Sequence, residues 1–266
     1  MACDRIDVGG LGMDIVVVGG RGLVGRNVVD RLRAQGHRVS SASRVTGVDV
    51  ITGRGLAESL AGADVVVDVS NSPVFNGMAA FEFFKTAIAN LLDAERHAGV
   101  KHHVSLSVVG AERLDASPYL RGKTLQKRMI ESSGIPFTIV HATQFFEFLY
   151  DIITNAAAGR TINLSPAYIE PVASDDVAVT IARVAAGAPA NGSVEIAGPE
   201  RARMSELIQR HVMDMEAPYE VHTDSGATYF GATLSEFVLL PAQNAERGRL
   251  GYEAWLKQSD YARADW

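Results

Sequence analysis

Short runs of β-branched residues alternate with longer amphipathic segments through the first two-thirds of the chain. Runs typical of buried strands stand at Asp14–Val18, His37–Ser41, Val48–Ile51, Asp64–Val69, His103–Val108 and Phe137–His141. The helical spacing of apolar residues predicts helices between them at Val24–Ala34, Leu56–Leu60, Met78–Ala98 and Pro118–Ser133. Because strands that alternate with helices form parallel sheets covered on both faces, the pattern predicts an α/β fold with a doubly wound parallel sheet.

The regular alternation ends near residue 142. Beyond it we predict helices at Phe145–Ala158, Asp175–Ala186 and Met204–Met215, with short strands at Thr161–Leu164, Ile169–Val172 and Val194–Ala197. We therefore expect three parts. These are an N-terminal extension over 1–12, a core over 13–142, and a small mixed C-terminal region over 143–266 that completes the sheet and covers the substrate site.

Composition and charge exclude several classes of protein. The net charge of −6 gives the chain no general attraction for phosphate backbones, so nucleic-acid binding is not expected. No apolar run approaches the about 20 residues that a bilayer requires, and the first residues do not resemble a signal peptide. These features, together with the single cysteine Cys3, predict a cytoplasmic protein that does not bind membranes.

No metal site is predicted. Cys3 has no second cysteine, and the adjacent His102 and His103 begin a strand, so their side chains point to opposite faces. We expect these two histidines to lie at the surface or near a helix end rather than to share a metal ion.

A glycine-rich turn connects the first predicted strand to the first predicted helix. Gly19, Gly22 and Gly25 are spaced so that the chain can turn sharply and its backbone can approach a pyrophosphate at the helix N-terminus. The flanking strand and helix are the context in which such a pattern indicates a dinucleotide site. The predicted contacts in this turn are Gly19, Gly20, Arg21, Gly22, Leu23 and Val24.

The end of the second strand indicates which dinucleotide is bound. An acidic residue that would hold the ribose hydroxyls of NAD is missing there, and the sequence instead continues with Ser43 and Arg44. Arg44, with Ser43 and Arg21, could hold a 2′-phosphate, so NADP(H) is preferred and NAD(H) is the alternative. Asp49 could accept from the adenine amino group. Val69, Ser70 and Asn71, which follow the strand beside the glycine turn, are expected to line the ribose and pyrophosphate.

A serine, a tyrosine and a lysine form the candidate catalytic group. Tyr119 and Lys123 are four residues apart on one helix face, and Ser107 lies on the preceding strand. Carbonyl reduction needs a proton donor, and a nearby ammonium would lower the pKa of the phenol while the serine holds the carbonyl oxygen. The lysine could also bond the nicotinamide ribose.

The chain resembles the atypical short-chain dehydrogenases/reductases, in their NmrA-like, NAD(P)-binding branch. The resemblance rests on VVVGGRGLVG (16–25), LAGADVVVDVSNSP (60–73), LSVVGAERL (106–114), YLRGK (119–123), GIPFTIVHATQFFEF (134–148), PVASDDVA (171–178) and GSVEIAGPE (192–200). It implies a Rossmann fold, acid–base roles for Ser107, Tyr119 and Lys123, and nicotinamide contacts near Ala142. The chain departs from the family pattern at Arg21, usually a small residue, and at His141, where an arginine is common.

Residues after the sixth strand are expected to meet the substrate, because ligands bind at the carboxyl ends of parallel strands. Gln144, Phe145 and Phe146 are the candidates. The function expected is NADPH-dependent reduction of a carbonyl, enone or quinone group on a small, partly apolar molecule. Two alternatives stay open: an NADP-binding redox sensor without turnover, and a non-redox tailoring enzyme of secondary metabolism. The two longest helices could form a homodimer interface.

Overall fold

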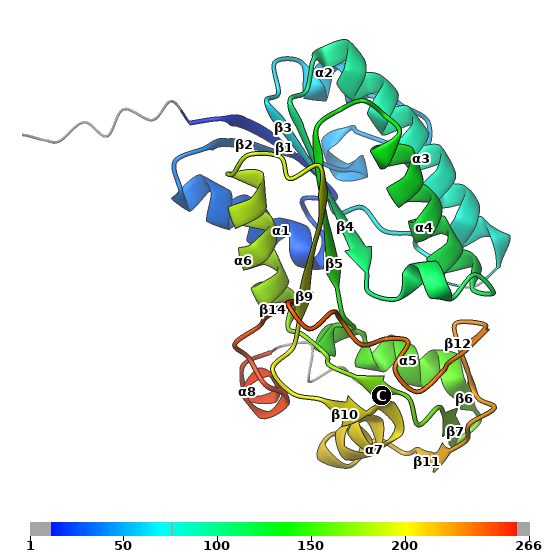
Figure 1. The fold of residues 1–266 in the computed structure, drawn as a ribbon. Helices are drawn as coiled ribbons and strands as arrows, with labels where there is room; N and C mark the ends of the chain where they lie inside the picture. The colour runs from blue at the N-terminus through cyan, green and yellow to red at the C-terminus, as the bar shows by residue number, and fades with distance from the viewer. Residues whose placement is uncertain (1–11, 76, 260–266) are drawn as a thin grey trace, which may run out of the picture.

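A seven-stranded parallel sheet forms the centre of the molecule (Figure 1). The computed structural model describes residues 12–75 and 77–259, so nearly all of the predicted N-terminal extension lies outside the described residues. The strand order is β14-β9-β5-β4-β3-β1-β2, and every neighbouring pair runs parallel. The strands are β1 (Asp14–Val18), β2 (Arg38–Ala42), β3 (Val65–Asp68), β4 (His102–Val108), β5 (Phe137–Ala142), β9 (Gly192–Ala197) and β14 (Glu246–Arg247).

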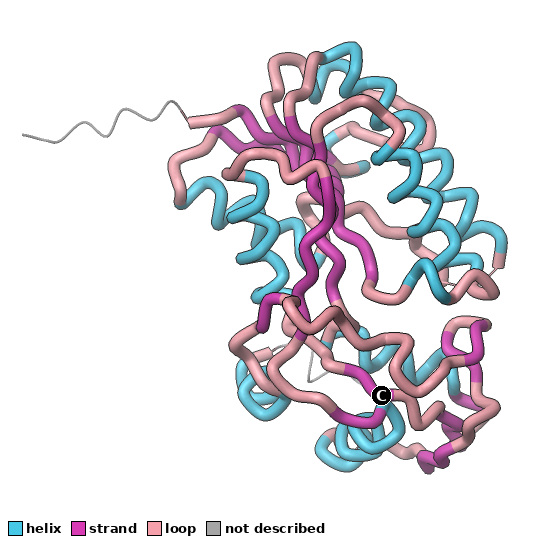
Figure 2. Tube along the Cα trace, viewed as in Figure 1, coloured by secondary structure: helices cyan, strands magenta, loops and turns pink. Residues whose placement is uncertain are grey.

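Helices cover both faces of this sheet, as the alternation of elements predicts (Figure 2). One face carries α1 (Leu23–Ala34) and α6 (Ser174–Ala185), and the other carries α2 (Leu56–Leu60), α3 (Met78–Ala98) and α4 (Pro118–Glu131). Successive residues of β1 divide between two cores, because strand side chains alternate between faces: Val17 packs with α1 and Val16 with α2 and α3. The predicted Rossmann-like, doubly wound sheet is confirmed.

The C-terminal region forms a smaller lobe below the carboxyl ends of the strands (Figure 1). Its helices are α5 (Leu149–Ala156), α7 (Met204–Asp214) and α8 (Tyr252–Gln258). Its short strands are β6 (Ala157–Ala158), β7 (Thr161–Leu164), β8 (Tyr168–Ile169), β10 (Ala202–Arg203), β11 (Glu220–Thr223), β12 (Thr228–Tyr229) and β13 (Ala232–Thr233). A single apolar core joins this lobe to α3 and α4 through residues such as Phe84 and Leu120. Chain segments from this region, β9 and β14, also extend the main sheet.

The prediction of a third strand at Val48–Ile51 is wrong. The segment after β2 instead folds as a 3-10 helix, η1 (Arg44–Thr46), followed by turns. Its backbone oxygens do not need a sheet neighbour, because the side-chain amide of Asn90 on α3 donates to the carbonyls of Val50 and Ile51 at 2.9 Å each. Of the apolar residues in this segment, Val48 and Val50 pack in the core that includes Leu91 of α3, whereas Ile51 is exposed.

The expectation that His102 and His103 lie at the surface is wrong, whereas His103 does lie near a helix end, because its partner Glu95 is in the last turn of α3. Both are buried in β4. His103 Nδ1 lies 2.8 Å from a carboxylate oxygen of Glu95 on α3, and His102 Nε2 lies 2.9 Å from the Thr138 hydroxyl. Burial raises the pKa of Glu95, and although burial alone would lower the pKa of His103, the Glu95 carboxylate raises it above its ordinary value. The pair joins α3 to the sheet.

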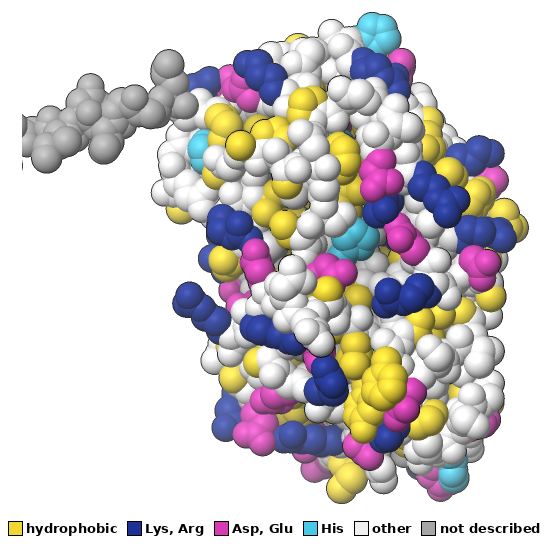
Figure 3. Space-filling model, viewed as in Figure 1, with side chains coloured by type: hydrophobic (Ala, Val, Ile, Leu, Met, Phe, Trp, Pro, Cys, Tyr) yellow, Lys and Arg dark blue, Asp and Glu magenta, His cyan; other side chains and the backbone are white. Residues whose placement is uncertain are grey.

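The surface carries charges of both signs. On the face drawn in Figure 3, Lys and Arg side chains are interspersed with Asp and Glu and form no long basic stripe. Within residues 12–75 and 77–259, no helix combines the length and apolar character needed to cross a bilayer.

The close contact of α1 with the glycine turn makes a stability prediction. A Cβ at position 25 would lie 2.2 Å from the carbonyl oxygen of Gly19, so Gly25→Ala must displace backbone. We expect this overpacking to reduce the free energy of unfolding by about 1–3 kcal/mol, measured by chemical denaturation. Gly187→Ala is the matched control, because its methyl would make only ordinary contacts at 3.5 Å. Equal stability of the two variants would contradict the packing described.

Candidate active site

One cavity of about 690 Å³ lies along the carboxyl ends of β1 to β5 and reaches into the C-terminal lobe. It brings together residues that are far apart in the sequence and that the sequence analysis singled out. These are Gly19, Arg21, Gly22, Leu23, Val24, Ser43, Arg44, Asp49, Val69, Ser70, Asn71, Ser107, Tyr119, Lys123, Ala142, Gln144 and Phe145. Gly20 and Phe146 do not line it.

The glycine turn forms one wall of this cavity. Gly19 has φ +79°, and the Gly22 amide donates to the Gly19 carbonyl at 2.9 Å, which closes the turn. The N-cap of α1 is Gly22, and no side chain caps the helix. The N–H groups of the first turn, at this wall of the cavity, therefore have no capping side chain. A Cβ at Gly19 would lie 2.9 Å from the Val69 carbonyl. A helix N-terminus that carries no side chain and packs this closely against the neighbouring strand is suited to binding a diphosphate.

Gly20 has a different reason to be glycine. A Cβ there would lie 2.5 Å from the Ser41 hydroxyl and 2.8 Å from the Val17 carbonyl. Gly20 therefore packs against β1 and β2 and does not line the cavity.

Two arginines stand at the end of the cavity beside β2. Arg21 and Arg44 are both exposed, and neither side chain makes a hydrogen bond or ion pair with another described residue. Asp49 is also at this end, and its Oδ1 accepts a hydrogen bond from the backbone amide of Ile51 at 2.8 Å. The guanidinium groups are thus the charges available here to a ligand, and they are positive.

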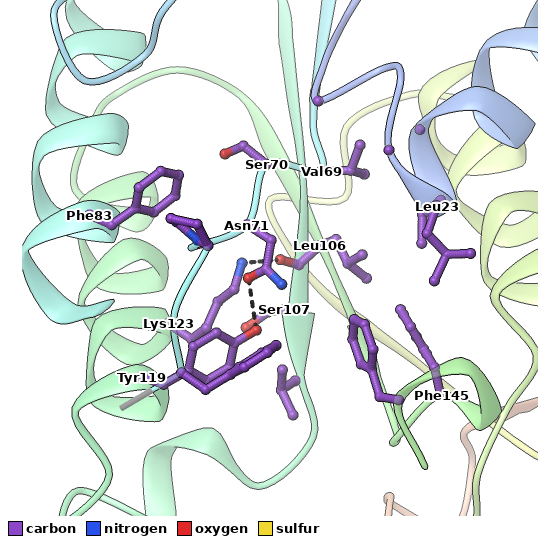
Figure 4. A pocket seen from close by; sticks show the side chains of 18 of the residues that line it. Leu23, Val69, Ser70, Asn71, Phe83, Leu106, Ser107, Tyr119, Lys123 and Phe145 are labelled. Carbon is purple, nitrogen blue, oxygen red and sulfur yellow. Dashed lines mark hydrogen bonds between the residues drawn. The ribbon is translucent and has the colours of Figure 1, made fainter. Parts of the chain in front are cut away.

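Tyr119 points from α4 toward the end of β3 (Figure 4). Its hydroxyl donates to Oδ1 of Asn71 at 2.9 Å. Burial raises the pKa of the phenol above its ordinary value, the Asn71 bond opposes this, and the Asp151 carboxylate adds to the rise. The expectation that Lys123 lowers this pKa is therefore wrong for this arrangement of side chains.

Lys123, one helical turn further along α4, is held on the same side of the cavity. Its Nζ donates to the Leu106 carbonyl and to Oε1 of Gln126 at 3.0 Å each, and it lies 4.4 Å from the centre of the Phe84 ring. Burial lowers the pKa of Lys123 to about 8, and Asp68 opposes that shift. The ammonium is consequently oriented by neutral acceptors, not by direct contact with a carboxylate.

Gln126 extends this arrangement and was missed in the sequence analysis. Its Nε2 donates to Oδ2 of Asp68 at 2.8 Å, while Oδ1 of Asp68 accepts from the Ser70 amide at 2.9 Å. Gln126, Lys123 and Asp68 are all buried. The signal that could have found Gln126 is its helical spacing, because positions 119, 123 and 126 share one face of α4.

The other end of the cavity is aromatic. Phe145 lines it and stacks on Phe148 at 5.2 Å between ring centres. Phe146 instead points into the lobe core, stacked 5.3 Å from Trp255, because neighbouring residues at the start of η3 (Phe146–Phe148) project in different directions. Phe146 therefore belongs to the lobe core and does not line the cavity. Sequence reasoning missed part of the further aromatic lining, which comes from the loop before α3 and from the C-terminal lobe: Phe75, Tyr229 and Phe230. Phe83 of α3 and Phe148 of η3 line the cavity as well.

Ser107 and Gln144 stand between these two ends. Ser107 lies at the carboxyl end of β4, buried and facing the cavity beside Tyr119 and Lys123 (Figure 4). The buried Gln144 amide interacts with the phenol of Tyr229, whose pKa burial raises, but in a geometry too poor for a full hydrogen bond. Both side chains thus have polar capacity left for a ligand.

Comparison with known proteins places these features in context. A family model described as NAD(P)H-binding matches residues 19–186. Two curated relatives, both described as photosystem II assembly factor Ycf39, come from Cyanophora paradoxa and Synechocystis sp. and are each 24% identical over 151 residues, 52% of this chain. The match spans about half of those relatives, at 47% and 46% of their lengths.

Solved structures share the fold at low sequence identity. MoeE5 in complex with UDP-glucose and NAD has a TM-score of 0.70 at 17% identity, covering 94% of this chain and 98% of that one. A short-chain dehydrogenase/reductase superfamily protein from Agrobacterium tumefaciens with bound NAD scores 0.66 at 17% identity, covering 94% and 97%. The dTDP-4-dehydrorhamnose reductase of Bacillus anthracis in complex with NADP scores 0.64 at 11% identity, covering 90% and 94%.

The buried network of Lys123, Gln126 and Asp68 makes a second prediction. Gln126→Leu leaves Oδ2 of Asp68 without a donor, so the free energy of unfolding at pH 7 should fall by about 1–3 kcal/mol in chemical denaturation. Adding Asp68→Asn removes the stranded charge, so the double variant should lose less than the sum of the single losses.

Thr124→Val serves as the control for this experiment, because the Thr124 hydroxyl donates only within the helix, to the Leu120 carbonyl. Its loss should stay below about 1 kcal/mol. Strict additivity of the Asp68 and Gln126 substitutions would show that the two side chains do not interact.

Proposed function

Because the chain belongs to the NAD(P)H-binding family and has the fold of the atypical short-chain dehydrogenases/reductases, we propose that it is an NADPH-dependent oxidoreductase. Its substrate would be the carbonyl, enone or quinone group of a small, partly apolar molecule. One observation carries the proposal: Tyr119, Lys123 and Ser107 line the same cavity as the glycine turn, where that cavity becomes aromatic.

The glycine turn would hold the cofactor's diphosphate. Gly19, Gly22 and the first turn of α1 present backbone without side chains, which is what close approach of a diphosphate needs. Leu23, Val24, Val69, Ser70, Asn71 and Ala142 would complete the cofactor contacts along the cavity. The buried Ser70 hydroxyl supports this assignment, because no described residue bonds it. NADP(H), when bound, supplies the hydride.

The unpaired Arg21 and Arg44 support a preference for NADP(H) over NAD(H). A guanidinium group binds a phosphate through charge-assisted hydrogen bonds, and these two have no competing carboxylate among the described residues. Ser43 lies beside Arg44 and could add a hydroxyl. The arginines would therefore recognise the 2′-phosphate at the adenosine end.

Tyr119 would donate the proton to the substrate oxygen. The phenol is protonated at neutral pH at its ordinary pKa of about 10, which is the form that reduction requires, and burial raises that pKa further and so makes the group a weaker acid. The Asn71 carboxamide fixes the direction of the hydroxyl, and Ser107 would hold the carbonyl oxygen. Lys123, fixed by Leu106 and Gln126, would place a positive charge and a donor beside the cofactor's ribose.

The first test of this function removes the proton donor. Tyr119→Phe keeps the ring but deletes the hydroxyl, so turnover of quinones and ketones should fall by a factor of about 10²–10⁴ while NADPH affinity changes little. The measurement is the decay of NADPH absorbance, with NADPH affinity followed by fluorescence. Tyr168→Phe, which alters a ring stacked on Phe237 outside the cavity, is the control. Undiminished turnover in Tyr119→Phe would remove Tyr119 from the mechanism.

The second test addresses the cofactor. Arg44→Ala should weaken NADP⁺ binding by about 10- to 100-fold, because one charge-assisted hydrogen-bonding group is lost, and should leave NAD⁺ binding nearly unchanged. Calorimetric titration of both nucleotides measures the difference, with the exposed Arg54→Ala as the control outside the cavity. Equal losses for both nucleotides would contradict recognition of the 2′-phosphate by Arg44.

A further inference from the structure

A carboxylate lies at the aromatic end of the cavity. Asp151, in the first turn of α5, lines the cavity with its neighbour Ile152 and with Phe148. The other carboxylate of the cavity lining, Asp49, stands at the opposite end, among the residues that follow β2. The lining is therefore polarised, with free guanidinium groups where the glycine turn and β2 meet and a carboxylate where α5 begins.

The Asp151 carboxylate has no partner among the described residues. No hydrogen bond or ion pair to its side chain occurs there, and no described cation lies close enough to lower its pKa. Lys123, which also lines the cavity, donates hydrogen bonds to the Leu106 carbonyl and to Gln126 instead. Burial alone raises the pKa of Asp151, which is the behaviour of a carboxyl group without a counter-charge.

The carboxylate lines the same cavity as Tyr119 and acts on its phenol. Its charge contributes to the raised pKa of the Tyr119 phenol, after burial itself. Around Tyr119, aromatic rings form a cluster centred on Phe75, whose ring centre lies 5.2 Å from those of Tyr119 and Phe230 and 6.1 Å from that of Phe148. A carboxylate that lines one cavity together with several aromatic rings is a combination that can bind an organic ammonium group.

We propose that Asp151 anchors a protonated amine of the substrate, so that the substrate is a small carbonyl compound with an aromatic or apolar body and a basic nitrogen. This proposal rests on the proposed reductase function for the carbonyl and on the cavity alone for the amine. The rings enclose the apolar body, and Asp151 neutralises the ammonium. The same charge disfavours anionic substrates. A nucleotide sugar carries a diphosphate of its own, and among the described residues the aromatic end has no cationic side chain free to bind it.

Binding without turnover tests the anchor separately from the reaction. Four probes share one ring and one ketone: 4-(aminomethyl)acetophenone, its neutral analogue 4-ethylacetophenone, the alcohol 4-(hydroxymethyl)acetophenone and the anion 4-acetylphenylacetate. Each is titrated calorimetrically into the full chain with NADP⁺, which has no hydride to give, and without it. We expect the amine to bind at least about tenfold more tightly than the ethyl analogue.

Asp151→Asn is the decisive variant, because it keeps the side-chain shape and removes the charge. It should abolish the preference for the amine and leave NADP⁺ affinity and binding of the ethyl analogue unchanged. Asp115→Asn makes the same charge change at an exposed position outside the cavity and should keep the preference. Thermal unfolding of each variant shows whether the fold is intact.

The outcomes separate the two proposals. Equal binding of amine and ethyl probes, tighter binding of the anion or of the alcohol, or an amine preference that survives Asp151→Asn would each overturn the anchor. An Asp151-dependent amine preference without NADPH oxidation by any ketone supports the anchor and contradicts the reductase function. NADPH oxidation without that preference supports the reductase function and contradicts the anchor.

Discussion

The site depends on the contact between the end of β3 and one face of α4. Asp68 and Asn71, three residues apart, bind Gln126 and Tyr119, and Gln126 in turn holds Lys123. Because Asp68, Gln126, Lys123 and Tyr119 are buried while Asn71 is exposed, breaking these bonds would leave the polar groups of those four buried residues without water. The network therefore fixes the position of the phenol and the ammonium relative to the strand that forms the neighbouring cavity wall. The glycine turn is placed against the same strand end, since Gly19 packs on the Val69 carbonyl.

Much of the fold could be predicted because its elements obey local rules. The helix Met78–Ala98 begins and ends as its apolar spacing and its terminal glycine predict, and the cavity lining includes most of the residues expected from the glycine pattern and the strand ends. The failures have tertiary causes. The apolar run Val48–Ile51 looks like a strand, but the carbonyls of Val50 and Ile51 accept hydrogen bonds from the side chain of Asn90. Asn90 is 40 positions from Val50 in the sequence. The burial of His103 was missed because its pairing with Glu95 on α3 is not visible in the sequence.

The details of the site were the hardest to predict. The spacing of Tyr119 and Lys123 predicts that both face the cavity, but not that Leu106 and Gln126 capture the ammonium. Burial then dominates the pKa of the phenol and raises it, an effect that the spacing of Tyr119 and Lys123 does not predict. The aromatic end is assembled from a loop near Phe75, from η3 and from the C-terminal lobe, and no periodic pattern connects these segments. Charge is distributed along the cavity in the same way, with arginines at one end and Asp151 at the other.

The central claim is that one dinucleotide spans this cavity, with its diphosphate on the glycine turn and its reactive ring beside Tyr119. The most direct measurement is a crystal structure of the protein in complex with NADP⁺. The account predicts that the nicotinamide ring contacts the cavity wall formed by Ser107, Tyr119 and Lys123, and that the 2′-phosphate lies near Arg44. A nicotinamide ring bound away from Tyr119, or a glycine turn that makes no contact with the diphosphate, would contradict it.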